Sequence, residues 1–233
     1  MDQQVKEAIV LAGGFGLRLR SEIGELPKSL ARVNDLPFLN YVLNHLKKYG
    51  IKKVVLSVGY KWEMISDYYG KKYEGMELVY AIEEQPLGTG GAIRHALEYI
   101  SDHHFLALNG DTIFDIDLQA FYTFHLKENG LVTIAAKKMQ DTGRYGSLQI
   151  DKNHKVLQFN EKKAGENGII NGGIYCLSKD IQSFFPDEEK FSFEKDVLPS
   201  LVGKDMLKSC LFDGYFIDIG IPEDFQQFKQ HHS

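Results

Sequence analysis

The stretch AIVLAGGFGLRLR, residues 8–20, contains the transition that decides the fold, because an apolar run passes directly into a glycine-rich turn. The run from Ala8 to Gly13 is uninterrupted and apolar, as is typical of a strand buried on both faces. Glycines at positions 13, 14 and 16 follow, and Arg18 stands where a helix is expected to begin. Ligands of α/β sheets bind at the carboxyl ends of strands. This turn is therefore the first candidate phosphate-binding site.

Strand-like and helix-like segments alternate along the first part of the chain. Further strands are predicted at residues 53–59, 77–82, 104–111 and 131–137, with helices at 38–50, 61–69, 91–100 and 117–127. This alternation predicts a parallel, three-layer α/β sheet with right-handed crossovers. After Lys138 short strand-like runs follow one another, which predicts an antiparallel or mixed excursion. Late helices are predicted at 194–202 and 222–229.

Composition limits the class of function. The chain has 233 residues and a formal net charge of −5, so we expect no nucleic-acid partner. The N-terminal MDQQVKE is polar, and no apolar run approaches the roughly 18 residues of a membrane span, so we expect a soluble, cytoplasmic protein without membrane contact. Cys176 and Cys210 match no metal spacing, which favours reduced thiols. The sequence has no coiled-coil heptads and leaves a homo-oligomer open.

Two well-known phosphate loops do not fit the glycine-rich turn. A dinucleotide fingerprint needs a third glycine and an acidic residue about 20 positions later. A P-loop needs G-x-x-x-x-G-K-[ST], and Lys28-Ser29 has no such glycine pair before it. We interpret the turn as another kind of phosphate site, in which backbone N–H groups of Gly13 and Gly14 meet phosphate oxygens while Arg18 and Lys28 supply positive charge. A plain solvated turn is the alternative.

Two aspartates end apolar runs elsewhere, Asp111 in LNGD and Asp218 in YFIDIG. Mg²⁺ takes one or two protein carboxylates and completes its shell with water and substrate phosphate. Placed on the same sheet edge as the phosphate turn, the two aspartates predict a magnesium site. Taken alone, each would be a turn-former or a cap, which is how we interpret Asp115 and Asp117, before the helix expected at 117–127.

No catalytic base is visible in the sequence. There is no G-x-S-x-G or H-E-x-x-H motif, and no Cys/His pairing of catalytic character. Such a site suits a nucleophile that is already ionised, and a sugar phosphate meets this need because its second pKa is about 6. Positioning and charge neutralisation would then perform most of the catalysis.

Ordered motifs over essentially the whole chain resemble the sugar-1-phosphate nucleotidyltransferase family. LAGGFGLRLR is similar to the family signature [LA]-x-G-G-x-G-x-R-L, LPKSL to its P-K loop and EEQPLGTGGAI to its base-binding segment. LNGD, FNEKK, NGGIY and FIDIGIPEDF resemble the metal-bearing strand end, the sugar-binding E-K, the N-[AG]-G-[IVL]-Y strand and the closing D-[IV]-G-x-P-E-D motif. The resemblance implies that an NTP and a sugar 1-phosphate give an NDP-sugar and pyrophosphate, with Mg²⁺ as cofactor.

The same resemblance implies an architecture. We expect an α/β fold, a Rossmann-like three-layer sandwich with a mostly parallel mixed sheet and a smaller β-rich excursion that binds the sugar. One nucleotidyltransferase domain would span residues 1–233, with a nucleotide-binding part over about 1–137 and a sugar-binding part over about 138–233.

Residue roles follow from the resemblance position by position. Arg18, Lys28 and Asp111 would be catalytic, and Asp111 and Asp218 would hold the metal. The implied nucleotide-binding residues are Leu11, Gly13, Gly14, Arg18, Glu83, Pro86, Gly88 and Thr89. The implied sugar-phosphate-binding residues are Gly146, Glu161, Lys162, Asn171 and Gly172.

Glu83 is the residue from which we predict the nucleobase. It lies five residues before Gly88, where thymidylyl and uridylyl relatives tend to carry glutamine. Guanine presents N1–H and N2–H₂ as adjacent donors, which a carboxylate accepts as a pair, so we predict GTP. A solvated loop charge is the alternative.

The motif combination in so short a chain is most similar to members that act on D-glycero-α-D-manno-heptose 1-phosphate. Mannose, glucose and N-acetylmuramate 1-phosphates stay open, as does uridylyl or thymidylyl transfer to a hexose 1-phosphate. A non-catalytic nucleotide-sugar sensor is disfavoured because Arg18, Lys28, Asp111 and Asp218 are all present.

Overall fold

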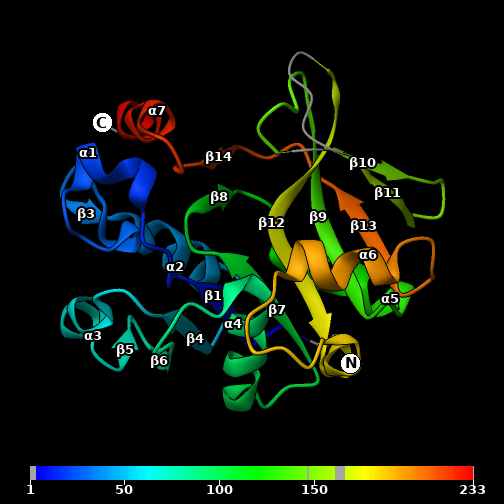
Figure 1. Cartoon of the computed structure of the whole chain (residues 1–233), viewed down its shortest axis with the longest axis horizontal. Coiled ribbons are helices and arrows are strands. Elements are labelled where there is room, and N and C mark those ends of the chain that lie inside the picture. The colour runs from blue at the N-terminus through cyan, green and yellow to red at the C-terminus, as the bar shows by residue number, and fades with distance from the viewer. Residues whose placement is uncertain (1–3, 146, 161–165, 233) are drawn as a thin grey trace.

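A ten-stranded mixed sheet runs through the computed structural model, which describes residues 4–145, 147–160 and 166–232. Figure 1 shows it extending from β5 and β6 at one side of the molecule to β10 and β11 at the other. Its strands are β1 (Glu7–Leu11), β4 (Lys53–Val58), β5 (Lys72–Tyr73), β6 (Met76–Ile82), β7 (His104–Asn109), β9 (Val132–Met139), β10 (Ser147–Ile150), β11 (Val156–Asn160), β12 (Gly168–Ser178) and β13 (Leu207–Leu211). Two small sheets pair β2 (Arg32–Val33) with β3 (Leu36–Pro37), and β8 (Thr112–Phe114) with β14 (Phe216–Asp218).

The centre of the large sheet is parallel, in the order β7-β1-β4-β6. Ile9 in β1 lies between Val55 of β4 and Ala107 of β7, so this strand is buried on both faces as its uninterrupted apolar sequence predicts. Beyond β7 the direction changes, because β12 is antiparallel to both β7 and β9. The predicted α/β class, with a parallel core and an antiparallel excursion, is confirmed.

Helices cover both faces of this sheet. They are α1 (Arg20–Ile23), α2 (Phe38–Lys48), α3 (Trp62–Tyr69), α4 (Gly88–Ala96), α5 (Leu118–Glu128), α6 (Leu198–Leu201) and α7 (Pro222–His231). Shorter 3₁₀ turns are η1 (Leu17–Leu19), η2 (Lys28–Leu30), η3 (Leu97–Tyr99) and η4 (Lys179–Phe184), and η5 (Phe193–Val197) is a π-helix. Ala8 and Val10 pack in the core with α2, α3, α5 and α7, whereas Ile9 packs in the core with α4 and α6. This alternation along one strand gives the three layers.

Two helix predictions were wrong in their bounds. The helix expected at 91–100 begins at Gly88, because the N–H groups of Gly90 and Gly91 donate to Phe191 O and fix an earlier start. The segment expected as one helix at 194–202 is instead the π-helix η5 followed by α6. Both differences arise from the contact between these two segments. The local sequence of neither segment records that contact.

The end of the chain packs against its first third. In Figure 1 α7 lies beside α1 and β3, and Asn34 Nδ2 donates to His232 O at 2.7 Å. The Phe38 and Phe228 rings meet edge-on at 5.1 Å.

Within the described part of the chain, no helix is long and apolar enough to cross a membrane. Cys176 and Cys210 are free thiols, and Cys176 is buried.

Candidate active site

A cavity of about 300 Å³ opens at the carboxyl ends of β1 and β7. Its lining consists of Leu11, Gly13, Gly14, Phe15, Glu83, Pro86, Gly88, Thr89, Ala92, Asn109 and Asp111. Every predicted nucleotide-binding residue except Arg18 is in this set, together with the predicted metal ligand Asp111. Phe15, Ala92 and Asn109 were not predicted. The cavity therefore brings together segments that the sequence analysis connected only through their order along the chain.

The glycine-rich turn begins directly after β1. Gly16 has φ +61° and packs over Lys28, whose Cβ would lie 3.2 Å from a Cβ built on that glycine. A side chain there would be strained and would press on the lysine. A Cβ on Gly14 would meet no atom within 4 Å. The exposed backbone at Gly14 is thus open to a ligand from the cavity side.

Three charged side chains meet at one end of the cavity. Lys28 Nζ lies 2.6 Å from Asp111 Oδ2 and 3.8 Å from Asp218 Oδ1. The lysine side chain is only 11 % exposed and projects from η2, which begins directly after Pro27. We call this group of three residues the phosphate end of the cavity. Their association from three distant segments agrees with the predicted cluster.

The route by which Asp218 reaches this cluster differs from the prediction. We expected both aspartates at the edge of one sheet, but Asp218 belongs to β14, which pairs with β8 in a separate sheet. Asp218 stands opposite Thr112, and Ile219 N donates to Asp111 O at 3.0 Å. These short pairings place the two carboxylates on either side of Lys28.

Electrostatics at the phosphate end suit a bound cation. Burial, together with the negative charge of Asp111, raises the pKa of Asp218, while Lys28 and the hydrogen bond from Gly220 N oppose this shift. A divalent cation would relieve the repulsion between the carboxylates, and carboxylate oxygens are the ligands that Mg²⁺ prefers. In the described ranges no cluster of three or more His, Cys, Asp or Glu side chains could hold a metal. A metal here would need substrate or water oxygens to complete its shell.

Arg18 lies outside the cavity lining but close to the phosphate end. A Cβ built on Gly220 would lie 3.1 Å from Arg18 Nη2 and 2.9 Å from Asp218 Oδ1. The exposed guanidinium and the Asp218 carboxylate therefore approach the same small region of backbone. Arg18 is thus the second cation, after Lys28, that the structure brings near Asp218 at this end of the cavity.

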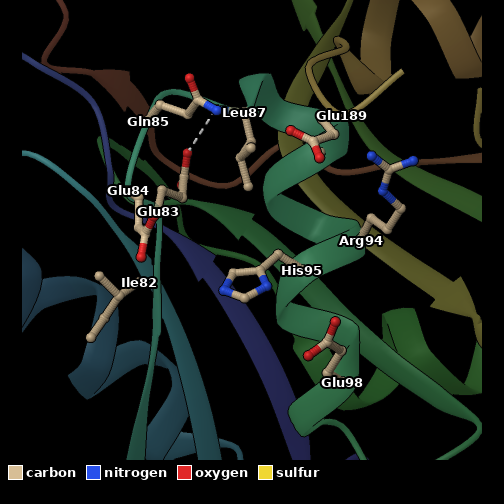
Figure 2. Close-up of a pocket in the computed structure, with 10 residues that line it drawn as sticks. Ile82, Glu83, Glu84, Gln85, Leu87, Arg94, His95, Glu98 and Glu189 are labelled. Atoms are coloured by element: carbon tan, nitrogen blue, oxygen red, sulfur yellow. Dashed lines mark hydrogen bonds between the residues drawn. The ribbon is translucent and has the colours of Figure 1, made fainter. Parts of the chain in front are cut away.

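Glu83 occupies the other end of the cavity, which we call the base end. Its carboxylate accepts hydrogen bonds from Ser57 Oγ at 2.8 Å and from Leu87 N at 3.1 Å. Figure 2 shows the segment that carries Glu83 beside α4. A Cβ on Gly13 would lie 2.8 Å from Glu83 Oε1. Each oxygen retains a further lone pair, so a fixed carboxylate still has acceptors to offer a ligand.

Ser57 is a site residue that the sequence analysis missed. It is fully buried in β4, within the otherwise apolar run KVVLSVG. One hydroxyl in a strand buried on both faces needs a partner, and that signal could have indicated a role.

A smaller cavity of about 170 Å³ continues from the base end past Gly59, Tyr60 and Gln85.

A further cavity of about 350 Å³ lies on the outer side of the same segment. Figure 2 shows its wall, formed by α4 with Arg94, His95 and Glu98. Arg94 is already engaged, since it donates to Pro186 O at 2.9 Å and Glu188 O at 2.8 Å. The glycine-rich turn, Lys28 and the two aspartates do not line this space, but Glu83 lines both cavities, so the two adjoin at the base end.

Part of the predicted sugar-phosphate site lies on β12. Asn171 and Gly172 occupy an irregularity in the pairing of β12 with β9. A Cβ on the adjoining Gly173 would lie 2.7 Å from Asn109 Nδ2, and Asn109 lines the cavity. Asn171 and Gly172 directly precede this contact along β12, and neither belongs to the cavity lining. The predicted residues Gly146, Glu161 and Lys162 lie outside the described residues.

Comparison with known proteins now adds to this geometry. The family model described as nucleotidyl transferase matches residues 7–233. The chain belongs to the nucleotidyl transferase family. The predicted family membership and enzyme class are thereby confirmed. The strand-end cavity of this nucleotidyltransferase lies within the matched range.

Several relatives match this nucleotidyltransferase along nearly its whole length. It is 46% identical to D-glycero-alpha-D-manno-heptose 1-phosphate guanylyltransferase of Campylobacter jejuni, over 95% of this chain and 98% of the relative. It is 43% identical to the enzyme of the same name from Aneurinibacillus thermoaerophilus, over 96% and 97%. The crystal structure of HddC from Yersinia pseudotuberculosis complexed with GMP-PN superposes with a TM-score of 0.87 at 38% identity, covering 98% of this chain and 100% of HddC.

Proposed function

We propose that this nucleotidyltransferase is a D-glycero-α-D-manno-heptose 1-phosphate guanylyltransferase. It would convert GTP and the heptose 1-phosphate into GDP-heptose and pyrophosphate. The observation that carries the proposal is the 46% identity to an enzyme of that name, which extends over 95% of this chain and 98% of the relative. The comparison thus extends over nearly the whole of both chains.

The proposed reaction exchanges one phosphorus–oxygen bond for another. A phosphate oxygen of the sugar phosphate forms a bond to the α-phosphorus of GTP, while the bond from that phosphorus to the α–β bridging oxygen breaks and pyrophosphate leaves. With a second pKa of about 6, the sugar phosphate is mostly dianionic at neutral pH, so no base has to activate it. This agrees with the charged phosphate end and with the lack of a catalytic-base motif in the sequence.

The chain's own groups at the phosphate end would align and neutralise the reacting phosphates. Lys28 is held by Asp111 and Asp218 with its ammonium group inside the cluster, and Arg18 approaches from outside. We assign both to phosphate oxygens, with the backbone of Gly13 and Gly14 completing the cradle. Asp111 and Asp218 would hold Mg²⁺, which when bound neutralises developing negative charge on the phosphates.

At the base end we assign guanine to Glu83. Ser57 and Leu87 hold its carboxylate, and the remaining lone pairs can accept from guanine N1–H and N2–H₂. The structure of the relative HddC contains GMP-PN, which supports a guanine nucleotide in this cavity. We further propose a cytoplasmic location for the reaction.

A substrate panel tests this proposal. GTP, ATP, CTP and UTP would each be combined with D-glycero-α-D-manno-heptose, mannose, glucose and N-acetylmuramate 1-phosphates in the presence of Mg²⁺, with pyrophosphate release as the readout. We expect the highest kcat/KM for GTP with the heptose 1-phosphate. A preference for UTP with a hexose 1-phosphate would contradict the assignment, and no release with any pair would favour a nucleotide-sugar sensor.

A further inference from the structure

One carboxylate outside the cavity lining accepts hydrogen bonds from three side chains. Glu194 Oε2 accepts from Thr89 Oγ1 at 2.6 Å and from Ser192 Oγ at 3.1 Å, and Oε1 accepts from Tyr175 OH at 3.1 Å. Glu194 lies in the π-helix η5, and π-helical turns are frequent at functional sites. Nothing in the sequence analysis singled it out. Its donors come from the cavity lining at Thr89, from β12 at Tyr175 and from its own segment at Ser192.

The first segment is the start of α4. Thr89 lines the cavity and, while it donates to Glu194, its Oγ1 also accepts from Phe193 N at 2.9 Å. Phe191 reinforces the contact, since its N–H donates to Leu87 O at 3.0 Å and its carbonyl accepts from Gly90 N at 3.0 Å. The position of Thr89 is therefore set by the segment that carries Glu194.

The second segment is β12, which packs against the cavity lining where Gly173 meets Asn109. Tyr175, 1% exposed, accepts from Asn171 Nδ2 at 2.8 Å while it donates to Glu194. Asn171 Oδ1 accepts from Gly173 N at 2.9 Å, which fixes the orientation of the amide. Burial, and then the charge of Glu194, raises the pKa of Tyr175 well above its usual range. The phenol therefore keeps the proton that it donates.

Together these bonds form one continuous path from Asn171 through Tyr175 and Glu194 to Thr89. We propose that Glu194 is a positioning residue for both substrates: it holds Thr89 in the lining that we assign to the nucleotide and, through Tyr175, Asn171 on β12, which we assign to the sugar phosphate. This inference rests on the proposed function for these two assignments. Glu194 acts only through other residues and does not line the cavity itself.

This path of hydrogen bonds can be interrupted at the Glu194 carboxylate or only at the branch from Tyr175 to Asn171. Glu194→Gln keeps the shape but leaves one acceptor oxygen for three donors, so we expect KM to rise about tenfold for both substrates, as for loss of a hydrogen bond to a charged group. Tyr175→Phe removes only the branch to Asn171. We expect it to raise KM for the sugar phosphate alone, with KM for the nucleotide within about twofold of wild type. Glu188→Gln, in an exposed carboxylate of the same segment, is the matched control and should match wild type.

The measurements would use the substrate pair that the wild-type enzyme turns over best in the panel above. A different preferred base or sugar would then contradict the proposed function while still allowing the test of Glu194. Circular dichroism would confirm that each variant is folded at the assay temperature. Unchanged KM values in Glu194→Gln, or an equal rise in both KM values in Tyr175→Phe, would overturn the inference. If Glu194→Gln does not fold, Tyr175→Phe tests the inference alone, because only its KM for the sugar phosphate should rise.

Discussion

The two ends of the cavity hold their carboxylates in different ways. At the base end the Glu83 carboxylate accepts from neutral donors, the Ser57 hydroxyl and the Leu87 N–H. At the phosphate end Asp111 and Asp218 share one cation, Lys28, and repel one another. Neutral donors orient a charge without cancelling it, whereas two carboxylates that share one lysine leave a net negative cluster that suits a metal cation. Changes at the phosphate end should therefore lower kcat, and changes at the base end should alter nucleotide choice.

The largest effect is expected for Asp111→Asn and Asp218→Asn. Each variant keeps the side-chain shape but removes a negative charge that would hold Mg²⁺. We expect each to lower kcat about 10²- to 10³-fold, comparable with the loss of one electrostatic group of a transition state. Pyrophosphate release at saturating substrates, repeated over a range of Mg²⁺ concentrations, measures this. A kcat close to that of wild type at all Mg²⁺ concentrations would remove the metal assignment for that aspartate.

Lys28→Ala should follow, with a reduction of kcat of about 10²-fold and a smaller change in KM. The reason is the loss of the one ammonium group that lies inside the carboxylate pair. Lys52→Ala, in an exposed lysine of the same chain, is the control and should leave turnover unchanged. Near-normal turnover in Lys28→Ala would exclude its assigned role in neutralising phosphate charge.

At the base end, Glu83→Gln should change selectivity more than rate. An amide presents one acceptor and one donor, so it cannot accept from both guanine donors. We expect the ratio of kcat/KM for GTP to that for ITP, which lacks the N2 amino group, to fall about tenfold. The kcat at saturating GTP should stay near wild type. An unchanged GTP preference would show that Glu83 only secures its own segment.

Ser57→Ala tests the support beneath Glu83. Loss of one hydrogen bond from a hydroxyl to the carboxylate, worth about 1.5 kcal/mol, should raise KM for GTP about tenfold, with kcat unchanged. Ser21→Ala, at an exposed serine in α1, is the matched control. Because Ser57 would act only through Glu83, its substitution should add nothing in the Glu83→Gln background. If the increases in KM caused by Ser57→Ala and Glu83→Gln were fully additive, Ser57 would not act through Glu83.

The smallest effect on activity is expected for His125→Gln, far from both ends. His125 is fully buried in α5, where its ring contacts His104 Nδ1 at 3.0 Å and Thr133 Oγ1 at 2.8 Å. Burial, with His104 second, lowers the pKa of His125 to about 3. Below pH of about 6.5 the unfolded chain binds a proton there that the folded chain does not. Stability should therefore fall as the pH decreases from 6.5 towards 3.

Urea unfolding of wild type and His125→Gln at pH 7.5, 6 and 5 measures this. The variant should lose stability less steeply with falling pH, by up to about 1.4 kcal/mol per pH unit. Its kcat at pH 7.5 should equal that of wild type, which would show that the changes at the two ends are local. Equal pH dependence in both proteins would mean that His125 is not the group that titrates.

Local patterns predicted much of the fold and the cavity. The strand predicted at 53–59 and the helix at 61–69 agree closely with Lys53–Val58 and Trp62–Tyr69, because apolar run and helical period are properties of neighbouring residues. The predicted cap Asp117 does accept from Ala120 N, at 2.8 Å. The glycine-rich turn, Glu83 and Asp111 meet in one cavity because all of them lie near carboxyl ends of strands in the parallel sheet, where topology alone brings them together.

What could not be predicted depends on contacts between distant segments. The pairing of β8 with β14 involves three-residue strands that carry no periodic signal of their own. The role of Glu194 depends on donors from α4 and β12, and in DEEKFSFEKD it is one of several similar carboxylates. Tertiary hydrogen bonds select such residues, and a single sequence does not record them.

Gly13 connects the two ends of the cavity in a way that bears on substrate engineering. A Cβ at this position would lie 2.8 Å from Glu83 Oε1 and 3.4 Å from Gly59 N. The flexible end of Glu83 would have to move, and would give up the hydroxyl that holds it, before any backbone shifted. A substitution at Gly13, in the glycine-rich turn, would therefore act first on Glu83, to which we assign the nucleobase. Redesign of this enzyme for another nucleotide has to vary positions 13, 57 and 83 together.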